Sequence, residues 1–146
     1  MELKIKKLKE NARIPQVATT GSAGMDLYAC IDESVTLSPG ELRLIPTGIA
    51  IELPDNGCAA FLYARSGLGV KHGICLSNGV GVIDSDYRGE IMVALHNHGT
   101  VSQSVESGER IAQISFVPFY AAEFDVCDTL SETVRGEGGF GSTGSK

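Results

Sequence analysis

The chain contains no apolar run long enough to cross a membrane, which argues against a membrane-spanning helix. Its first ten residues carry charges throughout and include no apolar block, so we expect no secretory signal. The sequence also lacks an internal repeat and an interdomain linker. These absences predict one ordinary domain in the cytoplasm, with 146 residues from which to build its core.

The four cysteines are far apart and form no C-x-x-C pair. This spacing argues against a zinc or disulfide framework and favours buried free thiols at Cys30, Cys58, Cys75 and Cys127. His96 and His98 could place two imidazoles on one face of a strand, but no cysteine or carboxylate stands nearby at ligand spacing. We therefore interpret the histidine pair as a polar strand end that runs into Gly99 and not as a zinc site.

Positive charge is also scarce. Lysine and arginine number 12 against 18 acidic residues, which gives a formal net charge of −6. A chain of this charge has no long-range attraction for nucleic acid. If the ligand is a polyphosphate, local arginines and a divalent cation must overcome the overall repulsion.

What the sequence does contain is mostly short alternating segments broken by turn residues. Ile49, Ile51 and Leu53 recur with period two before the turn residues at 54–57. Comparable runs are Val35 and Leu37, Leu42 and Leu44, Cys58 to Leu62, Ile91 to Leu95, and Ile111 to Val117. Many short strands at roughly ten-residue spacing predict an all-β sandwich or barrel over residues 1–134, followed by a separate tail at 135–146.

Residues 66–73 interrupt this β pattern and could form one or two turns of helix. Ser66 would be the N-cap, and Gly73 would end the helix. Because internal glycines lower helix propensity, such a helix would serve for its exposed N–H groups and not for its length. Arg65 directly precedes it, so the stretch is either an anion-binding site or an ordinary cap beside a surface arginine.

Residues 78–90 are a second unusual stretch, because an apolar segment there runs straight into acidic residues. Asp84 follows Ile83 at the end of the expected strand. We expect the Asp84 carboxylate to be partly desolvated, which favours a role as a general base over a role in solubility.

Other residues of the same stretch could complete a pocket around Asp84. Tyr87 lies three residues further on, near enough to form one wall. Gly79 and Gly81 leave the backbone uncovered by side chains, so a ligand could approach it closely. The alternative is a plain β-turn in which Asp86 and Arg88 form a surface ion pair of little energetic value.

One further acidic candidate is Asp26, which lies between Met25 and Leu27 and by alternation points away from them. A lone carboxylate on a strand is usually solvated. Residues 108–114 open another strand, whose polar points are Arg110 and Gln113.

The C-terminal residues 135–144 cannot form a core, because five of the ten are glycine. Glycine lets backbone N–H groups converge on an anion, and further donors come from Arg135, Ser142 and Thr143. Phe140 adds a flat face, so the composition suits a nucleotide. The G-x-G-x-x-G spacing here lacks the helix that a dinucleotide-binding turn needs. The alternative is a disordered tail with no binding role.

Five stretches, taken in order, resemble the five motifs of the trimeric dUTP pyrophosphatases (dUTPases). They are residues 23–29, 65–69, 78–89, 108–113 and 135–144. The resemblance covers nearly the whole chain, and five motifs in order at compatible spacing are far more specific than any one of them. Gly69 is a mild departure, since many members have alanine there, and it leaves Arg65 and Ser66 untouched.

The resemblance implies a jelly-roll-like β subunit of the dUTPase (β-clip) type, with one short helix and a flexible tail. It implies a homotrimer with three sites at subunit interfaces, where one subunit's tail closes over a site built largely by the other two. It also implies Mg²⁺ held by the triphosphate and ordered water, with Asp26 reaching the metal through water. The reaction would convert dUTP to dUMP and pyrophosphate, which supplies dUMP for thymidylate synthesis and keeps uracil out of DNA.

In that reaction Asp84 would deprotonate a water for in-line attack on the α-phosphorus and would accept a hydrogen bond from the sugar 3′-hydroxyl. The α- and β-phosphates would be bound by Arg65, Ser66, Gly67 and Gln113. The γ-phosphate end would be bound by Arg135, Gly141, Ser142 and Thr143.

Specificity would come from shape. The backbone from Asn78 to Ile83, with Gly81 and Val82 between them, would pair with the polar edge of uracil and collide with a thymine methyl. Tyr87 beneath the sugar would leave no room for a 2′-hydroxyl. Phe140 would stack over the uracil when the tail closes.

Three other interpretations remain at this point. The first is a dCTP deaminase-type enzyme of the same fold, which would not need the glycine-rich tail around Phe140. The second is a dUTP-binding regulatory protein, although an intact Asp84 argues against loss of catalysis. The third is a purely structural jelly roll, which leaves both the tail and residues 78–90 unexplained.

Overall fold

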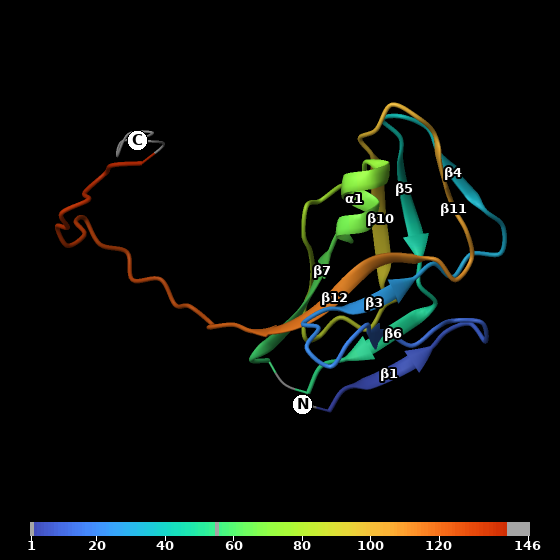
Figure 1. Cartoon of the computed structure of the whole chain (residues 1–146). Helices are drawn as coiled ribbons and strands as arrows, with labels where there is room; N and C mark the ends of the chain where they lie inside the picture. Colours follow the sequence, from blue (N-terminus) through green and yellow to red (C-terminus); the bar gives the residue numbers. More distant parts are fainter. Residues whose placement is uncertain (1, 55, 140–146) are drawn as a thin grey trace.

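The computed structural model describes residues 2–54 and 56–139, and its regular structure is almost entirely β (Figure 1). The only helix in these residues is α1 (Ser66–His72). The strands are β1 (Lys4–Lys7), β2 (Gln16–Val17), β3 (Met25–Tyr28), β4 (Val35–Leu37), β5 (Leu42–Pro46), β6 (Ile49–Glu52), β7 (Cys58–Tyr63), β8 (Ile74–Leu76), β9 (Gly81–Ile83), β10 (Met92–Asn97), β11 (Gln103–Val105) and β12 (Arg110–Pro118).

These strands form four antiparallel sheets. The largest has the order β2-β3-β12-β7-β9, and a second has the order β5-β10-β8. Two pairs, β1-β6 and β11-β4, complete the body. The prediction of an all-β, jelly-roll-like fold with one short helix is confirmed, although in the described part of the chain the sheets do not close into a barrel.

One continuous core joins the sheets, and period-two alternation builds it. On β10, Val93 and Leu95 are almost fully buried, whereas the alternate residues Met92, Ala94 and His96 are partly exposed. The core cluster also takes side chains from β3, β6, β7, β8 and β12. Burying these apolar side chains is the main source of stability for a fold with so little helix.

One apolar face points outward instead. Leu42 and Leu44, on β5, are 54% and 56% exposed, while Ile45 after them is buried. The two leucines lie two residues apart and so share one face of the strand, but Arg43 between them is exposed as well, and the leucine face looks away from the core. Because both leucines lie on the outer face of the β5-β10-β8 sheet, they leave part of that face apolar and uncovered within one chain.

The cysteines and histidines follow the sequence interpretation only in part. Cys30 and Cys58 are buried free thiols and Cys75 is half-buried. The prediction is wrong for Cys127, which is exposed because the chain has left the body at that point. His96 Nδ1 lies 2.8 Å from His98 Nε2, and His96 Nε2 lies 3.2 Å from the carbonyl oxygen of Gly40.

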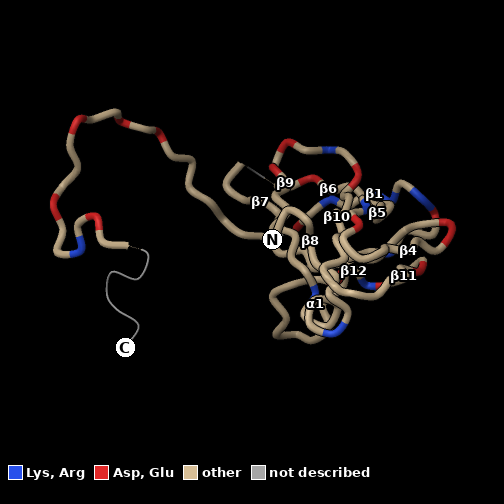
Figure 2. Tube along the Cα trace, turned by 90° about the horizontal axis from the view of Figure 1, so that it is seen from above, with Lys and Arg blue, Asp and Glu red and all other residues tan. Residues whose placement is uncertain are grey.

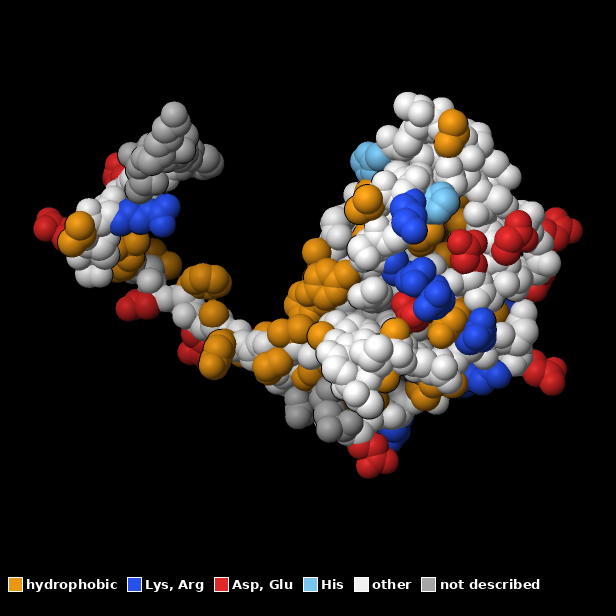
Figure 3. Space-filling view, in the orientation of Figure 1, with side chains coloured by type: hydrophobic (Ala, Val, Ile, Leu, Met, Phe, Trp, Pro, Cys, Tyr) orange, Lys and Arg blue, Asp and Glu red, His pale blue; other side chains and the backbone are white. Residues whose placement is uncertain are grey.

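Beyond β12 the chain leaves the body as a long extended segment without helix or strand (Figure 1). Phe119 N donates to Gly57 O at 3.0 Å, and Tyr120 is already 99% exposed. Figure 2 shows several acidic positions and one basic position along this segment, and Figure 3 shows hydrophobic side chains along it. Regular structure ends at Pro118, well before the predicted boundary at residue 134, which stays a prediction.

No helix among the described residues has the length and apolar character that crossing a membrane would require.

Candidate active site

A pocket of ≈ 220 Å³ opens beside β9, and we call it the hairpin pocket. It is lined by Leu62, Asn78, Gly81, Val82, Ile83, Asp84, Tyr87, Glu90, Ile91 and Met92. Six of the residues predicted to bind substrate or to act as the base therefore come together in one place. The roles of these six residues stay predictions, but the structure places all six around the same pocket.

Gly81 contributes only backbone to the lining of this pocket, and a side chain there would be tight against Leu62. β9 pairs with β7, and Gly81 is the partner of Leu62. A Cβ on Gly81 would lie 3.0 Å from the Cβ of Leu62, so even alanine would push against the core. Before it, Gly79 has a φ of 70°, a conformation that favours glycine and turns the chain from β8 into β9.

The ring of Tyr87 is fixed across the mouth of its own turn. Its hydroxyl donates to the carbonyl oxygen of Glu90 at 3.0 Å. A Cβ on Gly89 would overlap the Tyr87 hydroxyl and ring, so only glycine there lets the ring lie in this position. The Glu90 carboxylate in turn accepts a hydrogen bond from Gly48 N at 2.7 Å, which ties the turn to the body.

Arg88 holds the same turn together and does not act as the simple ion-pair partner considered above. Its Nη1 donates to the carbonyl oxygens of Ser85 at 2.7 Å and Tyr87 at 3.0 Å. No ion pair between Arg88 and Asp86 occurs in the described residues. The arginine thus stabilises the backbone that presents Asp84 and Tyr87 to the pocket.

Asp84 lies just past the end of β9 and lines the hairpin pocket as predicted. Its side chain is exposed, however, so the prediction of partial desolvation is wrong for the single chain. The physical reason is that β9 is the edge strand of its sheet, and one chain supplies no cover beyond it. A carboxylate in that position is accessible to water and to a ligand.

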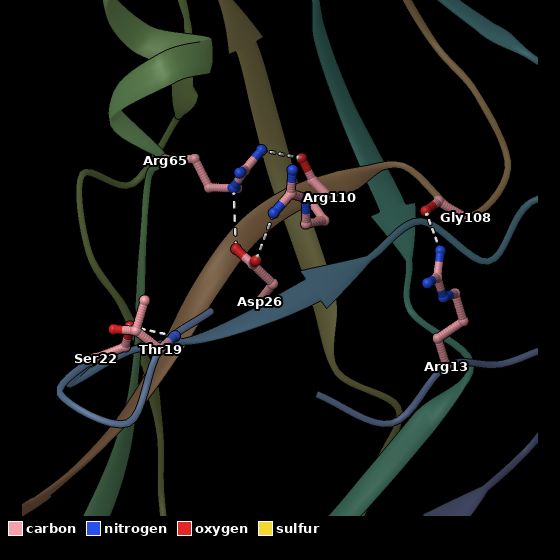
Figure 4. A network of polar contacts seen from close by, with 7 residues as sticks. All are labelled: Arg13, Thr19, Ser22, Asp26, Arg65, Gly108 and Arg110. Carbon is pink, nitrogen blue, oxygen red and sulfur yellow. Dashed lines mark hydrogen bonds and ion pairs between the residues drawn. The ribbon is translucent and has the colours of Figure 1, made fainter. Parts of the chain in front are cut away.

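A second polar centre lies at β3 and β12, and we call Asp26, Arg65 and Arg110 the cationic cluster (Figure 4). Arg65 Nε donates to Asp26 Oδ1 at 3.0 Å, and Arg110 Nη1 donates to Asp26 Oδ2 at 3.2 Å. The Asp26 side chain is only 9% exposed, so the interpretation of a solvated strand carboxylate is wrong. Two guanidinium groups and one carboxylate leave one excess positive charge in this cluster.

Gln113 lies beside the cationic cluster on the same face of the sheet. It is the β12 partner of Asp26 on one side and of Tyr63 on the other, and cross-strand partners share a face. A Cβ on Gly24 would come within 2.8 Å of Gln113 Oε1, so glycine at that position leaves room for the amide. Asp26, Arg65 and Gln113, which the sequence assigned to metal and phosphate, are thus neighbours.

The short helix α1 begins as predicted at residue 66 but is not capped as predicted. Its N-cap residue is Arg65, with φ −81° and ψ 132°, and no side chain caps the helix. Ser66 is therefore the first helical residue, and Arg65 before it has an extended backbone while its side chain binds Asp26. Gly73 ends the helix in the left-handed conformation, as expected.

The two centres do not meet within one chain. None of Asp26, Arg65, Arg110 or Gln113 lines the hairpin pocket formed by the described residues. Arg135 also lies apart from the hairpin pocket, on the extended segment, where its Nε donates to Gly138 O at 2.8 Å. Phe140, Gly141, Ser142 and Thr143, predicted to close the site, lie outside the described residues.

Sequence reasoning underestimated Arg110 and missed Gly89. The sequence identified Arg110 only as a polar residue on a strand, because nothing in the local sequence shows that it contacts a carboxylate 84 residues away. Gly89 was part of the motif at 78–89, but its requirement appears only once the position of the Tyr87 ring is known. The spacing of Arg110 and Gln113 was a signal in the sequence. Residues three apart point to opposite faces of a regular strand, so two polar residues at this spacing on one site require an irregularity in the strand.

Several known proteins are similar to this chain in sequence and in fold. The sequence profile of the dUTPase family matches residues 10–144. The deoxyuridine 5′-triphosphate nucleotidohydrolase of Desulfitobacterium hafniense is 57% identical over 132 residues, covering 90% of this chain and 87% of the relative. The protein of that name from Burkholderia cenocepacia is 53% identical over 144 residues, covering 99% and 97%.

Among solved structures, the dUTPase of Staphylococcus bacteriophage 80alpha with dUPNHPP has a TM-score of 0.89 to this chain. It is 30% identical and the match covers 98% of each chain. The profile match spans most of the sequence, and two relatives exceed half identity over nearly their full lengths. The chain therefore belongs to the dUTPase family.

Proposed function

We propose that this protein hydrolyses dUTP to dUMP and pyrophosphate by attack of water on the α-phosphorus. The hairpin pocket carries the proposal, because it combines an accessible carboxylate, an oriented ring and an open stretch of backbone in one cavity. Family membership and the names of the relatives support it. Its product would supply thymidylate synthesis, and its activity would keep uracil out of DNA.

Asp84 is the proposed general base. It accepts a proton from water as the water oxygen forms a bond to the α-phosphorus. The bond from that phosphorus to the bridging oxygen breaks, and the electron pair leaves with pyrophosphate. The same carboxylate accepts a hydrogen bond from the sugar 3′-hydroxyl. The exposure of Asp84 in the single chain supports this role, because both water and nucleotide can reach it.

The triphosphate binds at the cationic cluster and its neighbours. Its α- and β-phosphates are held by Arg65, Ser66, Gly67 and Gln113. The γ end is held by tail residues Arg135, Gly141, Ser142 and Thr143, which stay predictions from the sequence. One excess positive charge at the cluster, in a chain of net charge −6, gives the polyphosphate a local attraction that the whole molecule does not.

Mg²⁺ is the proposed cofactor, and the residues present fit it. Within residues 2–54 and 56–139 no three metal-ligating side chains cluster, which excludes an all-protein cage there. Mg²⁺ commonly binds through one carboxylate, substrate phosphates and several waters. Asp26 accepts two bonds from arginines, and a carboxylate has further lone pairs for a metal-bound water. When bound, Mg²⁺ supplies charge neutralisation on the triphosphate.

Selectivity for deoxyuridine would come from the hairpin pocket. The backbone at Asn78 and from Gly81 to Ile83 pairs with the polar edge of uracil, a site that cytosine mismatches and a thymine methyl overlaps. The Tyr87 ring, fixed by its bond to Glu90, blocks a 2′-hydroxyl. Phe140 stacks over the base when the tail closes.

We further propose a homotrimer in which each site takes its hairpin pocket and its cationic cluster from different subunits. Two observations support this arrangement. The two centres stay apart within one chain, and the leucines of β5 and the apolar extended segment lie uncovered. In this assembly residues 1–134 form the body, and residues 135–146 are the tail that closes a neighbouring site. The free thiols of Cys30 and Cys58 support a cytoplasmic location.

The test is pyrophosphate release from dUTP with Mg²⁺, measured beside dTTP, UTP and dCTP. We expect release from dUTP to exceed that from the other three by orders of magnitude. Ammonia release from dCTP is assayed in parallel. Equal rates on all four nucleotides, or ammonia from dCTP, would contradict the proposed function.

A further inference from the structure

The proposed function assigns Arg110 no phosphate contact of its own, yet Arg110 is one of the two arginines that bind Asp26. Its Nη1 lies 3.2 Å from Asp26 Oδ2. The three side chains differ in exposure, at 9% for Asp26, 23% for Arg65 and 50% for Arg110. The carboxylate is thus buried between two cations, and Arg110 is the outer one.

A β-bulge places Arg110 there. Arg110 pairs with Tyr28, and Ala112 pairs with Leu27, so two steps along β12 match one step along β3. On a regular strand Arg110 and Gln113, three residues apart, would point to opposite faces. The bulge shifts the alternation by one residue and brings both side chains to the face that carries Asp26.

The same bulge holds Arg65 by a second contact. Arg65 Nη1 donates to the backbone carbonyl oxygen of Arg110 at 3.2 Å, in addition to its bond to Asp26 (Figure 4). The backbone before the bulge is itself fixed, since Arg13 Nη1 donates to Gly108 O at 3.0 Å. Arg65 is therefore oriented by Asp26 and by the β12 bulge together.

The charge balance of the cluster gives Arg110 its importance. Asp26 and Arg65 alone would form a neutral pair, with no net attraction for a polyphosphate. Arg110 compensates the carboxylate and leaves one positive charge unbalanced at a partly buried position, where charges are screened less than in bulk solvent.

We propose that Arg110 is a positioning residue for phosphate binding: it compensates Asp26, so that Arg65 keeps both its orientation and its net charge for the substrate. This inference rests on the proposed function, in which Arg65 binds phosphate. It assigns Arg110 an action through Asp26 and Arg65 and not through direct contact with the nucleotide.

The experiment compares Arg110→Gln, Arg110→Lys and Arg65→Gln in the full chain. Binding of pyrophosphate without metal probes the cationic cluster, and binding of deoxyuridine probes the hairpin pocket. Arg43→Gln is the matched control, because Arg43 also pairs with a carboxylate, at 2.6 Å from Glu41, but outside the site. Thermal unfolding of each variant is measured alongside.

We expect Arg110→Gln to weaken pyrophosphate binding about tenfold, the scale of one partly screened charge, with deoxyuridine binding unchanged. Arg110→Lys restores the charge and recovers most of that affinity, and Arg43→Gln alters neither ligand. In kinetics, Arg110→Gln raises KM for dUTP more than it lowers kcat.

Three results would overturn parts of this account, and they differ from one another. Wild-type pyrophosphate affinity in Arg110→Gln, with a loss in Arg65→Gln, removes the role of Arg110 and leaves the proposed function standing. A lysine variant as weak as the glutamine variant means that the guanidinium fork touches phosphate itself, which refutes action through Asp26. Unchanged affinity in Arg65→Gln refutes the phosphate assignment on which both rest.

Discussion

In the hairpin pocket the surface offered to a ligand is largely backbone, one fixed ring and one carboxylate, whereas in the cationic cluster it is three charged side chains bound to one another. The first centre would select by shape, because a side chain at Gly81 would press on Leu62 and one at Gly89 would displace the Tyr87 ring. The second attracts by charge. A ligand with an uncharged flat end and a highly charged end would use both, although one chain keeps them apart.

The two centres therefore have different tasks in the proposed reaction: the hairpin pocket recognises the nucleoside, and the cationic cluster binds phosphate. Deoxyuridine should report on the hairpin pocket, and pyrophosphate should report on the cationic cluster. Substitutions in one centre should therefore change binding of one fragment and spare the other.

Asp84→Asn should lower kcat for dUTP by at least about a hundredfold, because an amide cannot accept the proton from water. Binding of both fragments should persist, since the substitution keeps the shape of the turn. The measurement is single-turnover hydrolysis together with fragment affinities. Asp86→Asn, in the same turn but outside the pocket lining, is the matched control and should behave as wild type. Near-normal turnover in Asp84→Asn would show that the base is elsewhere.

Deletion of residues 135–146 should remove most of the activity, because the proposed γ-phosphate contacts are lost. The oligomeric state should remain, since the body ends before this segment. Steady-state kinetics and sedimentation measure the two effects. Dissociation of the truncated protein into monomers would make the tail a structural element instead.

Tyr87→Ala should raise the rate on UTP relative to dUTP, by roughly tenfold, because the ring that blocks the 2′-hydroxyl is gone. Tyr87→Phe keeps the ring and loses only the bond to Glu90, so its ratio should stay near wild type. The readout is the ratio of kcat/KM for the two nucleotides. An unchanged ratio in the alanine variant would remove Tyr87 from the sugar pocket.

Gly89→Ala should displace the Tyr87 ring, because the added Cβ overlaps it. Overpacking of this kind costs about 1–3 kcal/mol, so we expect a lower Tm and a severalfold loss of deoxyuridine affinity with pyrophosphate binding intact. Gly21→Ala is the control, since a Cβ there meets nothing within 4 Å and its φ is not positive. Equal behaviour of the two variants would mean that the Tyr87 ring is not held as described.

The parts of the site that the sequence predicted well are local. Asn78 to Tyr87 are close together in the chain, so strand, turn and pocket follow from one short stretch. The all-β fold also follows from local alternation, although residues 42–44 on β5 are all exposed. Which side of a strand faces the core depends on packing, and alternation alone does not determine it.

The parts that the sequence predicted poorly depend on distant contacts. Ser66 looked like a cap because serine suits that position, but the cap position falls on Arg65, whose side chain binds Asp26, 39 residues away. Asp26 looked solvated because its two arginine partners are far away in sequence. Arg110 reaches it only through a bulge, and register shifts leave little trace in a single sequence.

Co-purified mixed oligomers of Asp84→Asn and Arg65→Gln subunits test the central claim most directly, which is that each site combines the hairpin pocket of one subunit with the cationic cluster of another. Each parent alone should be nearly inactive. In a cyclic trimer that contains both kinds of subunit, one interface brings an intact hairpin pocket to an intact cationic cluster, so dUTP hydrolysis should return. Mixed oligomers as inactive as their parents would contradict the account, because both centres would then have to serve the same site from one chain.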